Sequence, residues 1–149
     1  MKKKNDNERR FRFAVHELVC PHVHEKFGDN AWMFLDKRLL ETLYVIREHI
    51  LKVPMIVNTW KSGGEFSQRG LRCNLCGIVK KKTQAYLSAH VTGKGIDFHT
   101  REYSAEECRE KIIASAHLLP CPIRLEKDVN WVHLDVYDPT DGEEKTVLF

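Results

Sequence analysis

The chain has 149 residues, of which 42% are hydrophobic and 30% are charged, and its formal net charge is +3. This balance predicts one domain with a buried core and excludes a wholly disordered, collagen-like or coiled-coil chain. No apolar run approaches the roughly 20 residues that a membrane-spanning helix needs, and the charged first ten residues contain no apolar stretch typical of a secretory signal. We therefore expect a chain that is cytoplasmic as synthesised and has no membrane partner.

Basic residues are concentrated at the N-terminus and in the run Lys80, Lys81 and Lys82. We predict a basic tail over residues 1–10 and one domain over residues 11–149, since no linker or internal repeat divides the rest. Nucleic-acid binding normally needs a broad basic face or a reading helix, and neither is evident. We expect a monomer without a nucleic-acid partner.

The first strong element is a helix predicted over residues 30–51, with Asp29 or Asn30 as its cap. It ends before Pro54, because the residue before a proline is disfavoured in helical conformation. Its apolar positions recur three and four residues apart: Leu35, Leu39, Leu43, Ile46 and Ile50. A short buried strand is predicted over residues 55–57, and a long glycine-rich loop over residues 58–82.

A second helix is predicted over residues 105–118, because Ser104 and Glu107 form an S-x-x-E capping box at its start. A hairpin follows, with arms over residues 123–126 and 131–137. In its second arm, apolar residues alternate with polar or aromatic ones: Val132, Leu134 and Val136 against Trp131, His133 and Asp135. The remaining residues, 138–149, open with turn signals.

The eight histidines and five cysteines raise the question of a metal site. Cys73 and Cys76 form a C-x-x-C, and Cys20, His22 and His24 form a C-x-H-x-H. Together these residues could make a structural zinc site, of the kind found in small nucleic-acid-binding modules. This cysteine-based site is one of two alternatives.

The other alternative combines His90, Asp97 and His133. Gly93 and Gly95 lie between the first two, and their conformational freedom is expected to let the chain fold back between the two side chains. His133 lies on the polar face of the hairpin. Two histidines and one carboxylate leave a fourth zinc position for water, as in hydrolytic sites.

The segment Ser88-x-His90-x-x-Gly93-x-Gly95-x-Asp97, followed by Trp131-x-His133-x-Asp135, resembles the D-alanyl-D-alanine carboxypeptidase family of zinc peptidases. That family includes phage endolysins and shares its fold with the hedgehog signalling domain. Residues 68–72 resemble the loop that precedes this motif in the family, and residues 17–21 resemble the start of its compact members. The resemblance covers roughly residues 11–136.

The resemblance implies a zinc ion held by His90, Asp97 and His133. It implies that Arg72 grips the carboxylate or carbonyl of a substrate peptide, a role that suits a two-point guanidinium donor. Ser88 and Trp131 would take part in substrate binding. Asp135 would either orient a ligand or cap a strand edge. With the predicted elements, the implied fold is a single α+β domain whose small, mainly antiparallel sheet has helices on one side.

The sequence departs from the family pattern at two positions. Gly95 stands where alanine is usual, a change expected mainly to add flexibility. Asn130 stands where many members carry the acidic general base, and an amide cannot take a proton from water. Glu126 is the first candidate to replace that base, because an even-length turn would pair it with Trp131 and turn it toward the metal. Asp128, or no residue at all, is the alternative.

The expected function is therefore zinc-dependent hydrolysis of bacterial cell-wall peptides (peptidoglycan), of the D-Ala-D-Ala carboxypeptidase or L-Ala-D-Glu endopeptidase type. The protein would reach the wall by phage-type or other non-classical release. Because of Asn130, the alternative is a non-catalytic zinc-binding or wall-binding module on the same fold.

Overall fold

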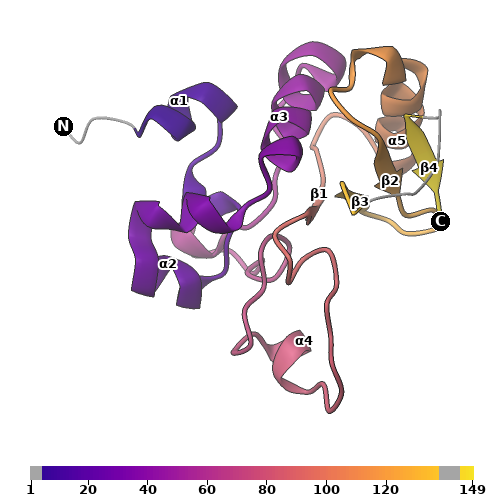
Figure 1. Cartoon of the computed structure of the whole chain (residues 1–149). Helices are drawn as coiled ribbons and strands as arrows, with labels where there is room; N and C mark the ends of the chain where they lie inside the picture. Colours follow the sequence, from indigo (N-terminus) through magenta and orange to yellow (C-terminus); the bar gives the residue numbers. More distant parts are fainter. Residues whose placement is uncertain (1–4, 138–144) are drawn as a thin grey trace.

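In the computed structural model, which describes residues 5–137 and 145–149, four short strands form one sheet (Figure 1). The strands are β1 (Gly95–Phe98), β2 (Ile123–Leu125), β3 (Val132–Asp135) and β4 (Thr146–Leu148), in the spatial order β1-β3-β2-β4. β3 pairs antiparallel with both β1 and β2, whereas β4 pairs parallel with β2. The α+β prediction is confirmed. The sheet is mixed, however, and not mainly antiparallel as predicted, because the C-terminal segment returns parallel to β2.

The hairpin of β2 and β3 follows the predicted alternation. One face of the sheet is fully buried and holds Ile96, Phe98, Ile123, Leu125, Val132 and Leu134. The other face carries Asp97, His133 and Asp135. Since successive side chains of a strand point to opposite faces, the apolar face builds the core and leaves the other face for polar groups. The turn signals predicted over residues 138–142 lie outside the described residues.

The helical elements run along the chain from α1 to η5. They are α1 (Asp6–Phe11), η1 (Val15–Glu17), α2 (Pro21–Phe27), η2 (Gly28–Phe34), α3 (Lys37–Val45), η3 (Ile46–Leu51), η4 (Trp60–Ser62), α4 (Gly77–Lys80), α5 (Ala105–Ala114) and η5 (Ala116–Leu118). Residues 6–10 of the predicted basic tail lie in α1, whose last residue, Phe11, is buried. Within the described residues, none of the helices is both long enough and apolar enough to span a membrane.

The first predicted helix is divided into three parts. Residues 28–34 form the short helix η2, and the regular helix α3 begins after Asp36, whose side chain accepts a hydrogen bond from the Arg38 N–H. Asp36 is therefore the cap, in place of Asp29 or Asn30. The predicted end is right, since η3 stops at Leu51 and Lys52 adopts a left-handed conformation. Four of the five predicted apolar positions are buried, and Ile50 is half-buried.

The second predicted helix has the expected start. Ser104 accepts a hydrogen bond from the Glu107 N–H, and the Glu107 carboxylate accepts one from the Ser104 N–H. The regular helix α5 stops at Ala114, and η5 continues the turn to Leu118. α5 packs against β3 and η3.

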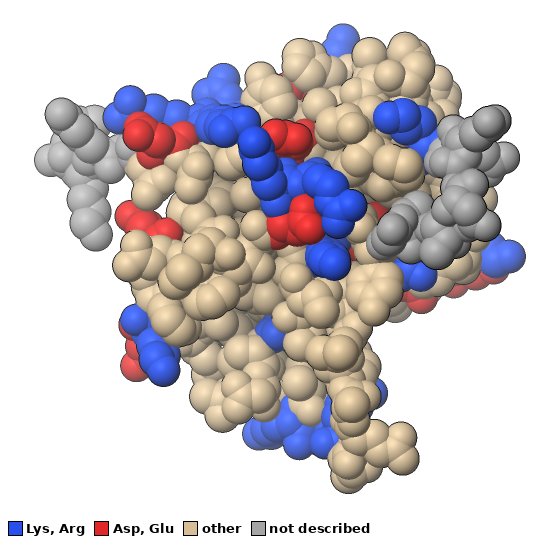
Figure 2. Space-filling view, viewed as in Figure 1, with Lys and Arg blue, Asp and Glu red and all other residues tan. Residues whose placement is uncertain are grey.

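Two irregular segments complete the scaffold. Residues 55–57 do not form a regular strand; Ile56 makes a single antiparallel bridge to His99. The loop over residues 58–82 is tied to the N-terminal part by a parallel bridge between Val19 and Leu71. Basic side chains gather at the tip near α4, where Lys80, Lys81 and Lys82 are exposed (Figure 2).

Candidate metal centre

The structure brings His90, Asp97 and His133 together. Asp97 of β1 and His133 of β3 lie directly opposite each other in the sheet, and His90 reaches them from the turn that precedes β1. Their ligand atoms all lie within 4.8 Å of one another, and all three residues are buried. Cross-strand neighbours share a face, so the sheet register itself places the carboxylate beside the imidazole.

Both imidazole rings are oriented by an acceptor on the nitrogen that faces away from the cluster. His90 Nδ1 lies 2.9 Å from the Gly70 carbonyl oxygen, which leaves Nε2 directed at Asp97, 3.3 Å away. His133 Nε2 lies 2.7 Å from Asp135 Oδ2, and its Nδ1 lies 2.9 Å from Asp97 Oδ1. Such partners fix the tautomer and direction of a metal-binding histidine.

Asp135 combines the two roles considered for it. Its carboxylate orients His133, and Oδ1 also accepts a hydrogen bond from the Tyr137 N–H at the end of β3. Arg124 of β2 holds the carboxylate with two hydrogen bonds of 2.8 and 2.9 Å. Arg124 is a site residue that was not predicted from the sequence. It lies two residues before Glu126 on the same arm, so the period-2 alternation of the strand could have found it.

Gly93 and Gly95 serve the turn in different ways. Gly93 has a φ of +71°, and a side chain there would collide with the Phe34 carbonyl oxygen, so the turn requires glycine. Gly95 lies in β1 and needs no special backbone conformation. A Cβ at Gly95 would lie 2.8 Å from the Ala89 Cβ and 3.1 Å from the Asp135 Cβ. Close packing against Ala89 and Asp135 explains the missing side chain at Gly95, whereas the expected gain in flexibility stays a prediction.

Opposite charges within the cluster shift the pKa values of Asp97 and His133 in opposite directions. Burial raises the pKa of the Asp97 carboxyl, but the hydrogen bonds and charges of His133 and His90 outweigh it and hold that pKa well below its usual range. Burial lowers the pKa of His133, whereas the carboxylates of Asp135 and Asp97 raise it, with a net result of about 9. The raised pKa favours the protonated form of His133 between the two carboxylates. A metal ion bound there would take the place of that proton.

Arg72, the predicted substrate-binding residue, lies beside the cluster. Its Nη2 is 3.5 Å from Asp97 Oδ2, its Nε donates to the Gln68 carbonyl, and its backbone N–H donates to the His90 carbonyl. Only 12% of its side chain is exposed. These contacts fix the guanidinium at the mouth of the site.

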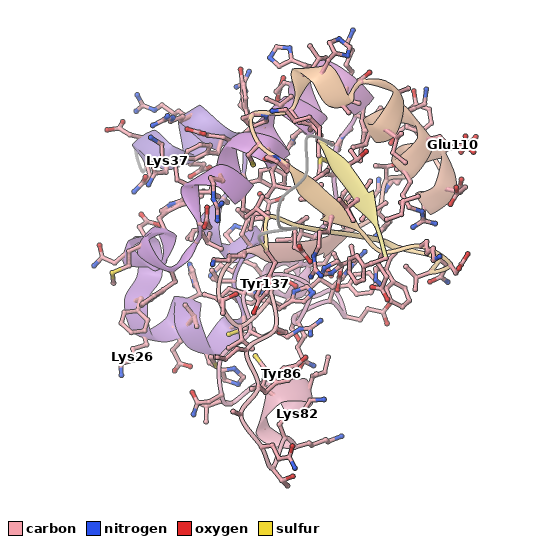
Figure 3. All side chains as sticks on the ribbon, turned by 45° about the vertical axis from the view of Figure 1, so that its right-hand side comes forward. Lys26, Lys37, Lys82, Tyr86, Glu110 and Tyr137 are labelled. Carbon is pink, nitrogen blue, oxygen red and sulfur yellow. The ribbon has the colours of Figure 1, made fainter. Side chains whose placement is uncertain are left out.

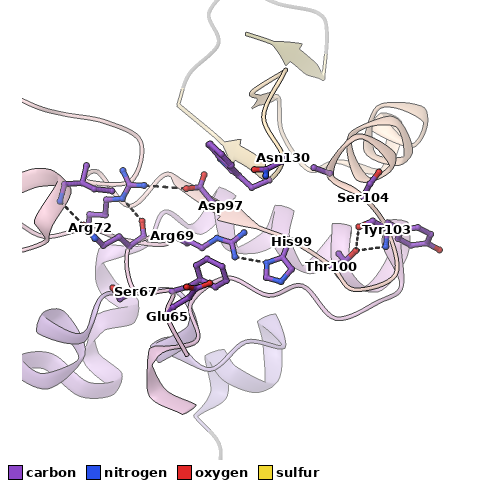
Figure 4. Close-up of a pocket in the computed structure, with 15 residues that line it drawn as sticks. Glu65, Ser67, Arg69, Arg72, Asp97, His99, Thr100, Tyr103, Ser104 and Asn130 are labelled. Atoms are coloured by element: carbon purple, nitrogen blue, oxygen red, sulfur yellow. Dashed lines mark hydrogen bonds and ion pairs between the residues drawn. The ribbon is translucent and has the colours of Figure 1, made fainter. Parts of the chain in front are cut away.

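A pocket of about 920 Å³ extends from Arg72 and Asp97 to Tyr103 (Figure 4). Asn130 and Trp131 line it, as does Arg69, a second arginine that was not predicted from the sequence. Arg69 Nη1 lies 2.7 Å from His99 Nδ1. Burial lowers the pKa of Arg69, while the charge of Asp97 works in the opposite direction.

A second pocket, of about 440 Å³, is lined by the three candidate ligands together with Ser88, Glu126 and Trp131. Tyr86 and Tyr137 also line it, Tyr137 at the end of β3 and Tyr86 on the loop after α4 (Figure 3). The Ser88 hydroxyl accepts a hydrogen bond from the Val91 N–H at 3.3 Å, so it also stabilises the turn that carries His90. Trp131 is 38% exposed and borders both pockets.

The candidate bases lie in different places. The Glu126 N–H donates to the His133 carbonyl, so Glu126 lies opposite His133 and not opposite Trp131 as predicted. The intervening residues, 127–132, are even in number, so Glu126 still belongs to the face of the ligands and lines the smaller pocket. Asp128 is exposed, has a φ of +62° and lines neither pocket.

The site thus combines three residues that could hold a metal ion with an arginine, a nearby carboxylate and two adjoining pockets. Comparison of the chain with protein-family models, with curated proteins and with solved structures finds no match.

Proposed function

We propose that this protein is a zinc peptidase that hydrolyses peptides of the bacterial cell wall. The observation that carries the proposal is that two imidazoles and one carboxylate, all buried, bring their candidate ligand atoms close together. In each imidazole, the ring nitrogen that faces away from the cluster is held by a hydrogen-bonding partner. The motif around these ligands resembles that of the D-alanyl-D-alanine carboxypeptidase family, and this resemblance supplies the substrate class.

The donor set suits zinc. Zinc accepts imidazole nitrogen and carboxylate oxygen, and a site with three protein ligands keeps one position open for water or substrate. When bound, zinc would polarise the scissile carbonyl and lower the pKa of its water to about 7. The two acceptors behind the rings, the Gly70 carbonyl and the Asp135 carboxylate, keep the coordinating nitrogens directed at Asp97.

The surrounding residues are suited to bind a peptide that ends in, or carries, a carboxylate. Arg72 presents a guanidinium between the site and the larger pocket, and its Nε bond to the Gln68 carbonyl keeps the group in place. Trp131 forms a wall between the two pockets. Glu126 is the carboxylate that we assign as proton acceptor, because it shares the smaller pocket with the three ligands.

The proposal is tested by measuring bound zinc and the hydrolysis of purified muropeptides with the same preparation. We expect His90→Ala to lose both the zinc of this site and hydrolysis. The control is His117→Ala, since His117 is exposed on η5, and it should keep both. Mass spectrometry of the products identifies the bond, because a carboxypeptidase releases terminal D-Ala and an endopeptidase separates L-Ala from D-Glu.

The base is tested with Glu126→Gln, which keeps the shape of the side chain but removes its basic form. We expect zinc content to be unchanged and the rate of hydrolysis to fall by about 10²–10⁴-fold. Wild-type protein that holds zinc at His90, Asp97 and His133 yet cleaves no muropeptide would contradict the enzyme assignment. That result would favour the non-catalytic zinc-binding or wall-binding module, in keeping with Asn130.

A further inference from the structure

A second group of metal-capable side chains lies outside the site described above. Cys20 occupies the position just before the first residue of α2, and His22 lies in the first turn of that helix. Cys73 and Cys76 flank the turn that leads into α4. The four ligand atoms lie within 4.8 Å of one another. We propose that these residues bind a second zinc ion, in a closed structural site that joins α2 to the loop before His90.

The distances agree with a tetrahedral site. His22 Nδ1 lies 3.6 Å from Cys73 Sγ and 3.8 Å from Cys76 Sγ. With Zn–S bonds of about 2.3 Å and Zn–N bonds of about 2.0 Å, tetrahedral geometry places two ligand atoms about 3.5–3.8 Å apart. The side chains therefore have the spacing that a zinc ion would impose. Three thiolates, formed as zinc displaces the thiol protons, and one imidazole would complete the coordination of zinc, which is typical of structural sites.

The local backbone supports this reading of the cysteines. None of the three is in a disulfide. The Leu75 N–H donates to Cys73 Sγ at 3.4 Å, and the Cys76 N–H donates to the Cys73 carbonyl at 3.1 Å, so the C-x-x-C forms a tight turn with both sulfurs directed at His22. Hydrogen bonds to a ligand sulfur orient it toward a metal. His24 is not part of this group, although the sequence offers it as a ligand.

The position of the site gives it a structural task. Leu71 exchanges backbone hydrogen bonds with the segment before α2: its N–H donates to the Leu18 carbonyl, and its carbonyl accepts from the Cys20 N–H. Arg72 follows directly, and the Gly70 carbonyl orients His90. A zinc ion at Cys20 and Cys73 would fasten this bridge at its end and so hold the loop that carries Arg72. The inference does not depend on peptidase activity.

The test is the zinc content of the full chain, purified under reducing conditions and measured by native mass spectrometry. We expect two zinc ions per chain in the wild type and one in His22→Asn, Cys76→Ser and His90→Ala. His22 is exposed, so its variant should fold without difficulty. Cys121→Ser is the matched control, because Cys121 is a free cysteine outside the group, and it should keep two zinc ions.

Cobalt substitution then assigns each ion to its ligands. The cobalt form of the wild type should show a thiolate-to-cobalt charge-transfer band. His90→Ala should keep this band, and Cys76→Ser should weaken or lose it. The proposal is overturned by a wild-type chain with one metal ion and no thiolate band, or by a disulfide among Cys20, Cys73 and Cys76 in the protein isolated without oxidant.

Discussion

Replacing Gly95 with alanine tests the packing behind the candidate metal centre. The new Cβ would lie 2.8 Å from the Ala89 Cβ, about 0.6 Å short of the 3.4 Å at which ordinary contact begins. Ala89 has no flexible end that could move aside, so its backbone must shift. Because His90 is the next residue, the shift displaces a proposed zinc ligand. Overpacking of this kind typically costs about 1–3 kcal/mol of the free energy of unfolding.

A double-mutant cycle isolates this contact. Ala89→Gly alone should cost about 1 kcal/mol through backbone entropy, but in the Gly95→Ala background it removes the clashing Cβ. We expect the double variant to be about 1–2 kcal/mol more stable than the sum of the single variants. The new Cβ at position 95 would still lie 3.1 Å from the Asp135 Cβ, so the free energy of unfolding of the double variant should stay below that of the wild type. Urea unfolding of zinc-loaded protein gives the energies, and competition with a chelator gives the zinc affinity.

Ala114→Gly provides the control for the cycle. Ala114 is exposed at the end of α5, and glycine there should cost a similar amount through helix propensity alone. When Ala114→Gly is combined with Gly95→Ala, the two losses in the free energy of unfolding should add. Additivity in the Ala89 cycle as well, with unchanged zinc affinity, would refute the packing of Gly95 against Ala89.

Three further predictions concern single contacts. Asp135→Asn removes the anionic acceptor behind His133 and should weaken zinc binding about 10–100-fold in a chelator competition titration; an unchanged affinity would mean that the ring is oriented without it. The buried Arg109 guanidinium donates three hydrogen bonds to carbonyls of the turn between β2 and β3. Arg109→Leu removes them and should lower the free energy of unfolding by about 2–4 kcal/mol, measured in urea. A loss below about 1 kcal/mol would contradict the role of Arg109 in holding this turn. Ser104→Ala should cost about 1 kcal/mol in urea unfolding by loss of the hydroxyl that accepts from the Glu107 N–H. The hydrogen bond from the Ser104 backbone N–H lowers the pKa of Glu107, so the contribution of the Glu107 carboxylate is present above its unfolded pKa and is lost as the pH falls through the lowered value; a Glu107→Ala cost that does not shrink in acid would count against this contribution.

The parts of the fold that depend on neighbouring residues could be predicted from the sequence. The capping box at Ser104 and the alternation that places His133 on the polar face need only residues a few positions apart. The start of α3 could not be found in this way, because the Asp36 N–H is bound by the Gly93 carbonyl, more than fifty residues away. The parallel pairing of β4 with β2 is likewise a contact between distant segments.

The candidate site shows the same division. The motif indicated His90, Asp97 and His133. The acceptor for His90, the Gly70 carbonyl, is brought close only by the tertiary structure. The acceptor for His133, the Asp135 carboxylate, follows from the alternation of side chains along β3. The register that pairs Glu126 with His133 is set by the length and shape of the turn, which the sequence left open. Arg69 was not predicted because its contact with His99 joins two loops.

The segment that carries Arg69 and Arg72 also covers an edge of the sheet. β1 is the outermost strand on its side, and its Asp97 N–H donates to the Arg69 carbonyl, while Ile56 and His99 exchange hydrogen bonds just beyond its end. Unpaired strand edges are sites where a second chain can add by backbone pairing, and proteins often cover them with a loop. Substitutions that release this segment would therefore do more than disturb the arginines. They would expose the edge of β1 and favour self-association of the protein.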